Sequence, residues 1–376
     1  MEHLLLLQVQ SLIPNDFELP IPGNVSFFQF LIVFSFACHI IFVNITIAGA
    51  VFSVINEIKG IRLQNKVYDK LALQLATQTS IYKSIAVVLG VAPMLLISVI
   101  YSQFFYPSTI LIGKAWLSLI IIIIVAFLLL YVYKFSWNRY QEKKGLHLVY
   151  GVSGTLLLLF VPLIFIVNVV SMLYPEMWAG SKGFFHGLFY YPQVWQRYAH
   201  FVLSSFAVMG IFMYMYNNRQ FKKMQQNNGC NNSAHAEVAV AEENSNIEAD
   251  VYKEGKRFGV KTAFWTTILQ ILVGSLVLIS LEKDKMMLYM GENMLLTSFL
   301  IVSIIGTVAL IFFLYMVMKT DAKRWLNLAA TAFIVVIAIM GWMRYEVRES
   351  YVQPHQQLNP PTVQAETLTI QAFVEK

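Results

Sequence analysis

Eight apolar runs divide the chain, and polar segments separate them. Each run is long enough to cross a hydrocarbon core of roughly 30 Å, which takes about 20 residues of α-helix. The runs lie near residues 26–56, 80–103, 110–133, 148–173, 198–216, 260–281, 294–318 and 325–343. The pattern therefore predicts an all-α fold, a polytopic membrane bundle of about eight transmembrane helices.

The composition agrees with a membrane protein. Apolar residues make up 57% of the 376 residues, and charged residues make up only 13%. A soluble chain carries about 25% charged residues. The net charge of +6 follows the polar segments between the runs, so it reflects membrane topology and gives no support to a nucleic-acid partner. The partner that the composition does predict is the lipid bilayer.

Positive charge orients the predicted bundle, because lysine and arginine stay preferentially on the cytoplasmic side. They gather in alternate polar segments that hold Lys59, Arg62, Lys66, Lys70, Lys134, Arg139, Lys143, Lys144, Arg219, Lys222, Lys223, Lys253, Lys256, Arg257, Lys319, Lys323 and Arg324. The N-terminus is therefore expected outside, and an even number of spans returns the C-terminus outside. Residues 1–24 lack the basic region and cleavage site of a signal peptide, so we expect the first span to be an uncleaved anchor.

One polar segment is much longer than the others. Residues 222–257 are rich in asparagine and acidic residues, which predicts a polar cytoplasmic linker with little order. It divides a five-helix N-terminal half, 1–221, from a three-helix C-terminal half, 258–350, and 351–376 is expected to be an extracytoplasmic tail. Cys38 lies in the first run and Cys230 in the linker, so no disulfide framework is expected.

A lone histidine, His39, lies inside the first apolar run. An imidazole at bilayer depth is costly unless something holds it, and ligation of a haem iron is one such reason. A hydrogen bond to a neighbouring helix is the other, and the residue alone favours neither. Gly49, further along the same run, offers a small surface that lets another helix approach closely.

Arg197 and His200 open the fifth run, three residues apart and on one helical face. An arginine in this position can hold a haem propionate while the imidazole binds iron, because guanidinium matches carboxylate geometry. The alternative is an arginine that snorkels to the membrane surface beside an interfacial histidine. Another histidine, His147, lies at a predicted membrane edge among lysines, so we expect it to be interfacial or solvated.

Trp342 and Glu346 stand four residues apart near the outer end of the last run, so they share a helical face. A salt bridge to an arginine would account for the carboxylate. A sharper interpretation makes Glu346 an axial ligand or a proton-handling group.

Taken together, these features resemble subunit I of the cytochrome bd family of terminal oxidases. The segments that carry the resemblance are His39 with Phe42-Val43 and Gly49, Gly90-Val91-Ala92, Trp137-Asn138-Arg139, Asn168 with Pro175, Gln196 to His200, and Gly341-Trp342 followed by Glu346. Their order and spacing make the case. The resemblance is good over about 27–217 and thinner over 258–350.

The resemblance implies a haem-binding oxidoreductase. His39 and Glu346 would be axial ligands in a two-haem site that holds haem b and haem d in the family and reduces oxygen to water. His200 would ligate a third, low-spin haem b, with Arg197 near its propionates and Trp342 also in the haem-binding set. The family pairs that histidine with a methionine, and here Met294 is the candidate substitute, because Val302 aligns with the family residue.

The chain departs from the family in three places that bear on mechanism, and one of them is that the family's ninth helix has no counterpart among the eight predicted spans. Residues 115–132 lack the family's pair of glutamates, and a short stretch, 282–292, replaces its quinol-binding loop. The electron donor is therefore expected to be something other than quinol at that loop, and a c-type cytochrome is the candidate. The resemblance also implies a second, subunit II-like membrane partner and the inner membrane of a bacterium or archaeon.

Three functions are open on the sequence. The first is a haem subunit that carries electrons from an external donor toward a two-haem site that reduces oxygen. The second is a redox-inactive structural or electron-wire subunit of a respiratory complex, which oxygen consumption would distinguish from the first. The third is a non-haem transporter in which the histidines are polar helix contacts, and haem content would decide it.

Overall fold

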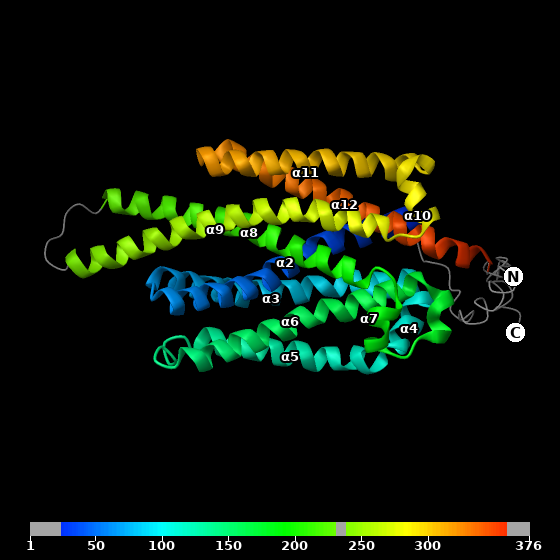
Figure 1. Ribbon diagram of the computed structural model, residues 1–376, viewed down its shortest axis with the longest axis horizontal. Helices are drawn as coiled ribbons and strands as arrows, with labels where there is room; N and C mark the ends of the chain where they lie inside the picture. Colours follow the sequence, from blue (N-terminus) through cyan, green and yellow to red (C-terminus); the bar gives the residue numbers. More distant parts are fainter. Residues whose placement is uncertain (1–23, 231–237, 359–376) are drawn as a thin grey trace, which may run out of the picture.

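The computed structural model describes residues 24–230 and 238–358, and these ranges contain helices and turns without a strand. The long helices are α2 (Val25–Leu63), α3 (Lys66–Ile100), α5 (Gly113–Phe135), α6 (Lys144–Leu173), α8 (Val194–Cys230), α9 (Val238–Ile279), α11 (Met294–Thr320) and α12 (Lys323–Leu358). The short elements are α4 (Ser102–Leu111), η1 (Pro175–Gly180), α7 (Phe184–Tyr190), α10 (Lys283–Met287) and η2 (Leu288–Glu292). Helices α4, α7 and α10 lie at the end of the bundle where α2 begins and α12 ends (Figure 1).

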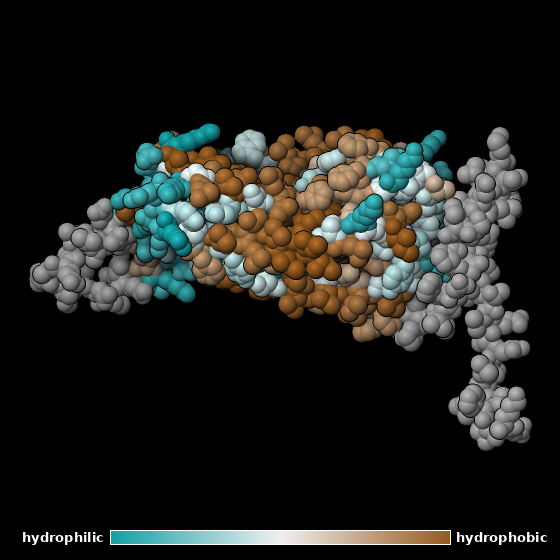
Figure 2. All heavy atoms as spheres, turned by 90° about the horizontal axis from the view of Figure 1, so that it is seen from below, coloured by the Kyte–Doolittle hydropathy of each residue, from teal (hydrophilic) through white to brown (hydrophobic). Residues whose placement is uncertain are grey.

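The eight long helices are each long and apolar enough to cross a membrane. They run side by side along the long axis of the molecule (Figure 1). Apolar residues cover the middle of the surface, and hydrophilic residues gather toward the two ends (Figure 2). This arrangement confirms the predicted all-α bundle of about eight spans, and the chain is a multi-pass membrane protein.

The helices extend beyond the apolar runs. Helix α2 continues to Leu63, and α3 already begins at Lys66. Helices α8 and α9 extend into the expected linker 222–257, which is therefore helical on both sides of 231–237, a stretch outside the described residues. Helix α12 likewise continues into the expected tail. Hydropathy marks only the part of a helix that suits hydrocarbon, whereas a polar extension keeps the same backbone bonding.

Helices α2 and α3 form an antiparallel hairpin around a tight turn. Gln64 ends α2 in the left-handed region at φ 50°, and the Asn65 side chain accepts a hydrogen bond from the backbone N–H of Val67 to cap α3. A Cβ on Gly60 would lie 3.1 Å from the backbone nitrogen of Asp69, and a Cβ on Gly49 would lie 2.5 Å from Oγ1 of Thr79. The close approach expected at Gly49 is thus confirmed.

Helices α8 and α9 cross at a second glycine contact. A Cβ on Gly210 would lie 2.6 Å from the carbonyl oxygen of Gly259, and a Cβ on Gly259 would lie equally close to the carbonyl oxygen of Gly210. Any larger side chain at either position would separate the two backbones. Helix α8 of the expected N-terminal half therefore packs directly on α9 of the C-terminal half.

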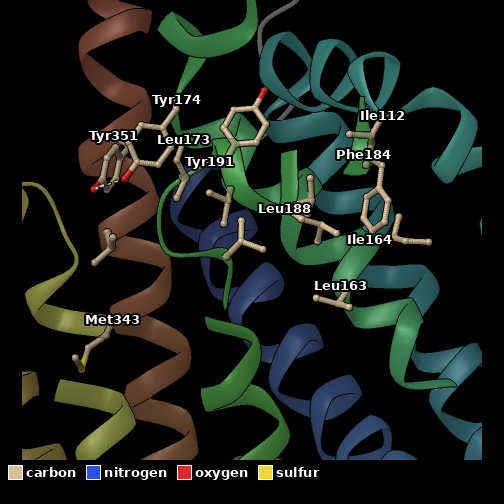
Figure 3. Close-up of a cluster of buried hydrophobic side chains, with 14 of the residues drawn as sticks. Ile112, Leu163, Ile164, Leu173, Tyr174, Phe184, Leu188, Tyr191, Met343 and Tyr351 are labelled. Atoms are coloured by element: carbon tan, nitrogen blue, oxygen red, sulfur yellow. Dashed lines mark hydrogen bonds between the residues drawn. The ribbon is translucent and has the colours of Figure 1, made fainter. Parts of the chain in front are cut away.

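A buried cluster closes the end of the bundle that carries the short elements. Its side chains come from α5, α6, α7, η2, α11 and α12 and from the turns beside them. Figure 3 shows Tyr174 and Tyr351 next to one another and Ile112, Phe184 and Ile164 in a second group. The hydroxyl groups of Tyr174 and Tyr351 lie 3.2 Å apart. This contact fixes the C-terminal part of α12 against the end of α6. It thereby sets the position of the polar residues of α12 along the bundle.

Candidate functional site

His39 is held by α3. Its Nδ1 lies 2.9 Å from the carbonyl oxygen of Ala86. A carbonyl only accepts, so Nδ1 carries the proton and Nε2 keeps its lone pair for another partner. A Cβ on Gly90, one turn along α3, would lie 2.7 Å from Cε1 of His39, so only glycine leaves room for the ring. This is the arrangement in which histidine ligates a metal, with one nitrogen anchored and the other directed to the ion.

His200 lies on α8 against α9. Its Nδ1 is buried and has no hydrogen-bond partner among the described residues. A Cβ on Gly274 of α9 would lie 3.5 Å from Cε1 of His200, in ordinary contact. A buried ring nitrogen without a partner is costly in a membrane interior. This nitrogen is therefore open to a ligand that the protein itself does not supply.

Arg197 is oriented from Gln193, one turn earlier. Its Nε and Nη2 donate to Oε1 of Gln193 at 3.0 and 2.7 Å. The amide of Gln193 in turn donates to the hydroxyl of Tyr174 at 2.9 Å and to the carbonyl oxygen of Ser280 at 3.1 Å. The backbone of Gln193 has φ 66°, a strained conformation for a residue other than glycine. The side chain of Gln193 in turn fixes the position of the Arg197 guanidinium.

Two further arginines, Arg344 and Arg348, project from α12 into the same region. The guanidinium of Arg344 lies 4.2 Å from the ring centre of Phe36 on α2, and that of Arg348 lies 4.8 Å from the ring of Tyr101. Arg348 is buried, and its Nη1 has no hydrogen-bond partner. Arg344 lies within electrostatic range of both Arg348 and Arg197, so like charges gather here.

These three arginines have no carboxylate within 4.0 Å among the described residues. Enclosed guanidinium groups are normally paired, because an unpaired charge in an apolar surrounding is costly. A ligand with carboxylate groups would satisfy all of them, and guanidinium binds carboxylate in a bidentate manner. The region therefore has the charge and the donors for an anionic group.

Glu346 is hydrogen-bonded to Trp342, four residues earlier on the same helix. Nε1 of Trp342 donates to Oε1 of Glu346 at 3.0 Å, which confirms that the two share a face. The salt bridge to an arginine, the simpler interpretation of this carboxylate, is not among the ion pairs of the described residues. Burial raises the pKa of Tyr289 on η2, Arg197 lowers it, and Tyr351 and Glu346 raise it further. Tyr289 thus lies within electrostatic range of both Arg197 and Glu346.

The positions of His39 and Glu346 imply two separate centres. A Cβ on Gly341 of α12 would lie 3.5 Å from Cγ1 of Val33 on α2, which sets these residues at one level. His39 is six residues further along α2, and Glu346 is five residues further along α12, which runs in the opposite direction. At a rise of 1.5 Å per residue the two side chains differ in depth by about 16 Å. They are too far apart to bind one iron.

Met294 is not positioned to complete a site at His200. It is the first residue of α11, and its side chain is 81% exposed. Such exposure turns it away from the bundle, whereas His200 faces α9. Val302, which the sequence aligns with the family's methionine, is also exposed at 46%. The structure brings neither residue into the interior beside His200.

The expectation for His147 was wrong. Its side chain is fully buried, with Nδ1 2.6 Å from Oε1 of Glu57 and Nε2 2.7 Å from the carbonyl oxygen of Tyr133. Sequence reasoning missed the partner, because Glu57 follows directly after the apolar run that ends near 56. The helix in fact continues another turn and a half, to Leu63. A carboxylate at the C-terminal end of a long apolar run was the available signal.

Comparison with known proteins places the fold. No family model matches this sequence, and no curated protein matches it either. Among solved structures the chain is similar to one in the structure of bd oxidase from Geobacillus thermodenitrificans, with a TM-score of 0.59 over 87% of each chain. The two chains are 14% identical over this alignment, so the likeness is one of architecture. The chain is a multi-pass membrane helical bundle with a bd-oxidase-like fold.

Proposed function

We propose that the chain is a haem-binding subunit of a bd-oxidase-like membrane oxidoreductase. The observation that carries the proposal is the set of three arginines, Arg197, Arg344 and Arg348, which have no carboxylate partner within residues 24–230 and 238–358. They lie in the part of the bundle that contains His200 and Glu346, and haem carries two propionates that need such donors. The bd-oxidase-like fold agrees with this function.

The residues present fit haem. His39 has an anchored Nδ1 and a glycine beside its ring, so its Nε2 would be the atom that holds a haem iron. Glu346 has one oxygen bound by Trp342 and would offer the other to a second iron. His200 would ligate a third iron, with Arg197 near the propionates. Haem b, and haem d at one site of the pair, are the cofactors that we propose.

When bound, haem would supply one-electron transfer and the chemistry of oxygen reduction. The chain's own residues determine where this happens. The Ala86 carbonyl sets the tautomer of His39, and Trp342 fixes the orientation of Glu346. The three arginines hold negative charge at the outer end, and the apolar helices around them exclude bulk water. Oxygen reduction at the two-haem site is the reaction that we propose.

The electron donor and the complex are part of the same proposal. Between α9 and α11 the described chain has only α10 and η2, 283–292, which leaves little surface for a quinol. We propose that a c-type cytochrome on the outer side donates electrons, and that a second, subunit II-like membrane chain completes the complex. The membrane would be the inner membrane of a bacterium or archaeon.

The test is haem content with variants at the proposed ligands. The full chain is purified in detergent with its co-purifying partners from a haem-replete host. We expect two or three haems per chain, and we expect His39→Ala, His200→Ala and Glu346→Ala each to lose a different one. Oxygen consumption with a reduced c-type cytochrome then tests the reaction. Absence of haem would exclude the function, and haem without oxygen consumption would leave an electron-carrying or structural subunit.

A further inference from the structure

A second polar site lies far from the arginines, at the end of the bundle that holds the α2–α3 and α5–α6 connections. Positive charge predicts that this is the cytoplasmic end. Its centre is the pair formed by Glu57 of α2 and His147 of α6, both of which are 0% exposed. An ionisable pair so completely enclosed is costly in a membrane protein and is more often functional than structural.

The hydrogen bonds define how many protons the pair holds. Nε2 of His147 must donate, because its partner, at 2.7 Å, is the carbonyl oxygen of Tyr133. The 2.6 Å contact between Nδ1 and Oε1 of Glu57 then contains one shared proton. The pair is either an imidazolium with a carboxylate or an imidazole with a carboxylic acid. Both forms are neutral, so moving the shared proton costs no net charge in the interior.

The pair also has an open position. Oε2 of Glu57 is buried and has no hydrogen-bond partner among the described residues. A carboxylate oxygen in this state can accept a proton from a water molecule or a neighbouring group. When one proton binds at Oε2 and the shared proton is released, the pair holds the same number of protons as before.

The surface is reached through two charged side chains. Nζ of Lys144 lies 4.0 Å from Oε1 of Glu57 and 2.6 Å from Oδ1 of Asp69, and the two side chains are 22% and 31% exposed. Nε1 of Trp137 donates to Oδ2 of Asp69 at 3.3 Å, which holds the carboxylate at the opening. The groups that can titrate or carry charge around Glu57 are therefore His147 and Lys144 from α6, Asp69 from α3 and Tyr133 from α5.

Aromatic rings keep the imidazole in place. The ring of Tyr133 stacks on His147 at 4.6 Å between centres, and the ring of Trp137 meets it edge-on at 4.7 Å. A Cβ on Gly151 would lie 2.6 Å from Cε2 of Tyr133, so glycine is what allows α6 to come this close. The imidazole is thus aligned with Glu57 and shielded from lipid.

Polar side chains continue inward from the pair. Gln78, Thr79 and Ser80 of α3 are buried, and their side-chain oxygen and nitrogen atoms have no hydrogen-bond partner among the described residues. Buried polar atoms of this kind are normally satisfied by ordered water. Thr79 lies level with Gly49, about 12 Å inward of Glu57, and His39 lies about 15 Å beyond that, at 1.5 Å per helical residue.

We propose that Glu57 and His147 form a proton-exchange site that is filled from the cytoplasmic end through Asp69 and Lys144 and that delivers protons along α3 toward His39. Helix α5 carries no carboxylate between 115 and 132, and Glu57 is the only carboxylate among the described residues that is buried. Proton exchange at the pair is supported by the contacts of Glu57 and His147 and does not depend on haem. Delivery to an oxygen-reducing centre rests on the proposed function.

The first experiment needs no haem. The full chain, labelled with ¹⁵N-histidine, is placed in lipid nanodiscs, and the exchange of imidazole N–H with water is measured by magnetic resonance. The chain has seven histidines, so His147→Gln identifies the signal of interest. We expect the His147 N–H to exchange at least tenfold faster than the backbone amides of the α2 and α6 residues around it, because a sealed pair exchanges only when the helices open.

Variants at the entrance make this experiment specific. Asp69→Asn and Lys144→Met should each slow the His147 exchange at least tenfold. Asp250→Asn is the matched control, because Asp250 forms an exposed ion pair with Lys253 at the same end and should change nothing. Exchange as slow as that of the backbone amides, or exchange that neither entrance variant alters, would show a sealed structural pair and overturn the proposal.

The second experiment tests delivery. In the haem-containing complex, proton uptake that follows reduction is recorded with a pH indicator. Glu57→Gln keeps the side-chain shape and should slow uptake at least tenfold while haem content stays the same. Unchanged uptake would overturn the delivery role. Absence of haem from the purified complex would instead exclude the proposed function. The exchange experiment would then still test whether Glu57 and His147 form a proton-exchange site.

Discussion

The Nδ1 of His39 lies 2.9 Å from the carbonyl oxygen of Ala86 on the neighbouring helix. This one bond fixes both the orientation of the imidazole and the nitrogen that carries its proton. The sequence leaves two roles open for His39, a hydrogen bond to a neighbouring helix and ligation of a haem iron. The two are compatible, because a hydrogen bond at one ring nitrogen orients the other nitrogen toward a metal. The Ala86 carbonyl and the gap at Gly90 together define the space beside the ring.

Filling that gap should disturb the site without disturbing the fold elsewhere. In Gly90→Val the new side chain would displace the His39 ring, since a Cβ alone would come within 2.7 Å of Cε1. We propose that the haem held by His39 is high-spin, and we expect its signal to fall roughly tenfold or more in the reduced-minus-oxidised spectrum. Gly145→Ala is the control, because a Cβ there meets nothing within 4 Å. An unaltered high-spin signal in Gly90→Val would separate His39 from haem.

His200→Ala should remove one low-spin b-type signal. The imidazole is the group whose buried Nδ1 lacks a partner, so its removal costs the protein no hydrogen bond, and the bundle should stay folded. The reduced-minus-oxidised spectrum gives the haem signal, and circular dichroism gives the helix content. A spectrum identical to that of the unmodified chain would remove the assignment of His200 as a ligand.

Arg344→Gln should have opposite effects on the haem-free and haem-containing protein. Without haem, the change removes one of three neighbouring cations that no carboxylate of the described segments pairs with, and it should stabilise the fold by about 1 kcal/mol or more. With haem, it removes a donor to a propionate and should lower the temperature of unfolding and the haem content.

Thermal unfolding of both forms tests this reversal. Arg257→Gln is the matched control, because Arg257 is 68% exposed and lies 3.9 Å from Glu254, a surface pair that contributes about 1 kcal/mol or less. If Arg344→Gln destabilised the haem-free form as much as the haem-containing form, the arginine would be a packing residue and not an anion donor.

Stability should also depend on pH through Glu176 on η1, outside the spans. Burial raises the pKa of its carboxyl group, its own backbone hydrogen bond lowers it, and Glu282 raises it further. The folded protein therefore holds this proton at a pH where the unfolded chain has lost it. Stability from this group is present below the usual carboxyl pKa and is lost as the pH rises through the raised value.

Glu176→Gln removes that dependence, because an amide does not titrate. The unfolding temperature of the variant should fall less steeply than that of the unmodified chain as the pH rises through the mildly acidic range. Asp284→Asn, on α10 at the same end, serves as the comparison. Parallel curves for Glu176→Gln and the unmodified chain would show that the carboxyl group keeps its ordinary pKa.

Much of the fold could be predicted from hydropathy alone. The eight apolar runs became eight long helices, because the cost of unpaired backbone groups in lipid leaves helix as the available structure for such runs. Helix ends could not be predicted in the same way. Polar residues continue α8 and α9 into 222–257, and nothing in their hydropathy distinguishes a helical extension from a loop.

The candidate site was predictable where its residues lie close together in the sequence. Trp342 and Glu346 share a face because they stand four apart on one helix, and their hydrogen bond follows. The partners of His39 and His147 come from other helices, so single-sequence patterns do not reveal them. His147 looked solvated beside lysines, yet Glu57 draws it into the interior. The exposure of Met294 could not be predicted either, because the end of an apolar helix can face lipid as easily as the bundle.

The most direct test of the account is a pyridine haemochrome assay, with a reduced-minus-oxidised spectrum, on the detergent-purified chain and its co-purifying partners. We predict two or three haems per chain, with at least one low-spin and one high-spin signal. No haem after expression in a haem-replete host with its partners would contradict the account. The unpaired arginines and anchored histidines would then need another anionic ligand, as in a transporter.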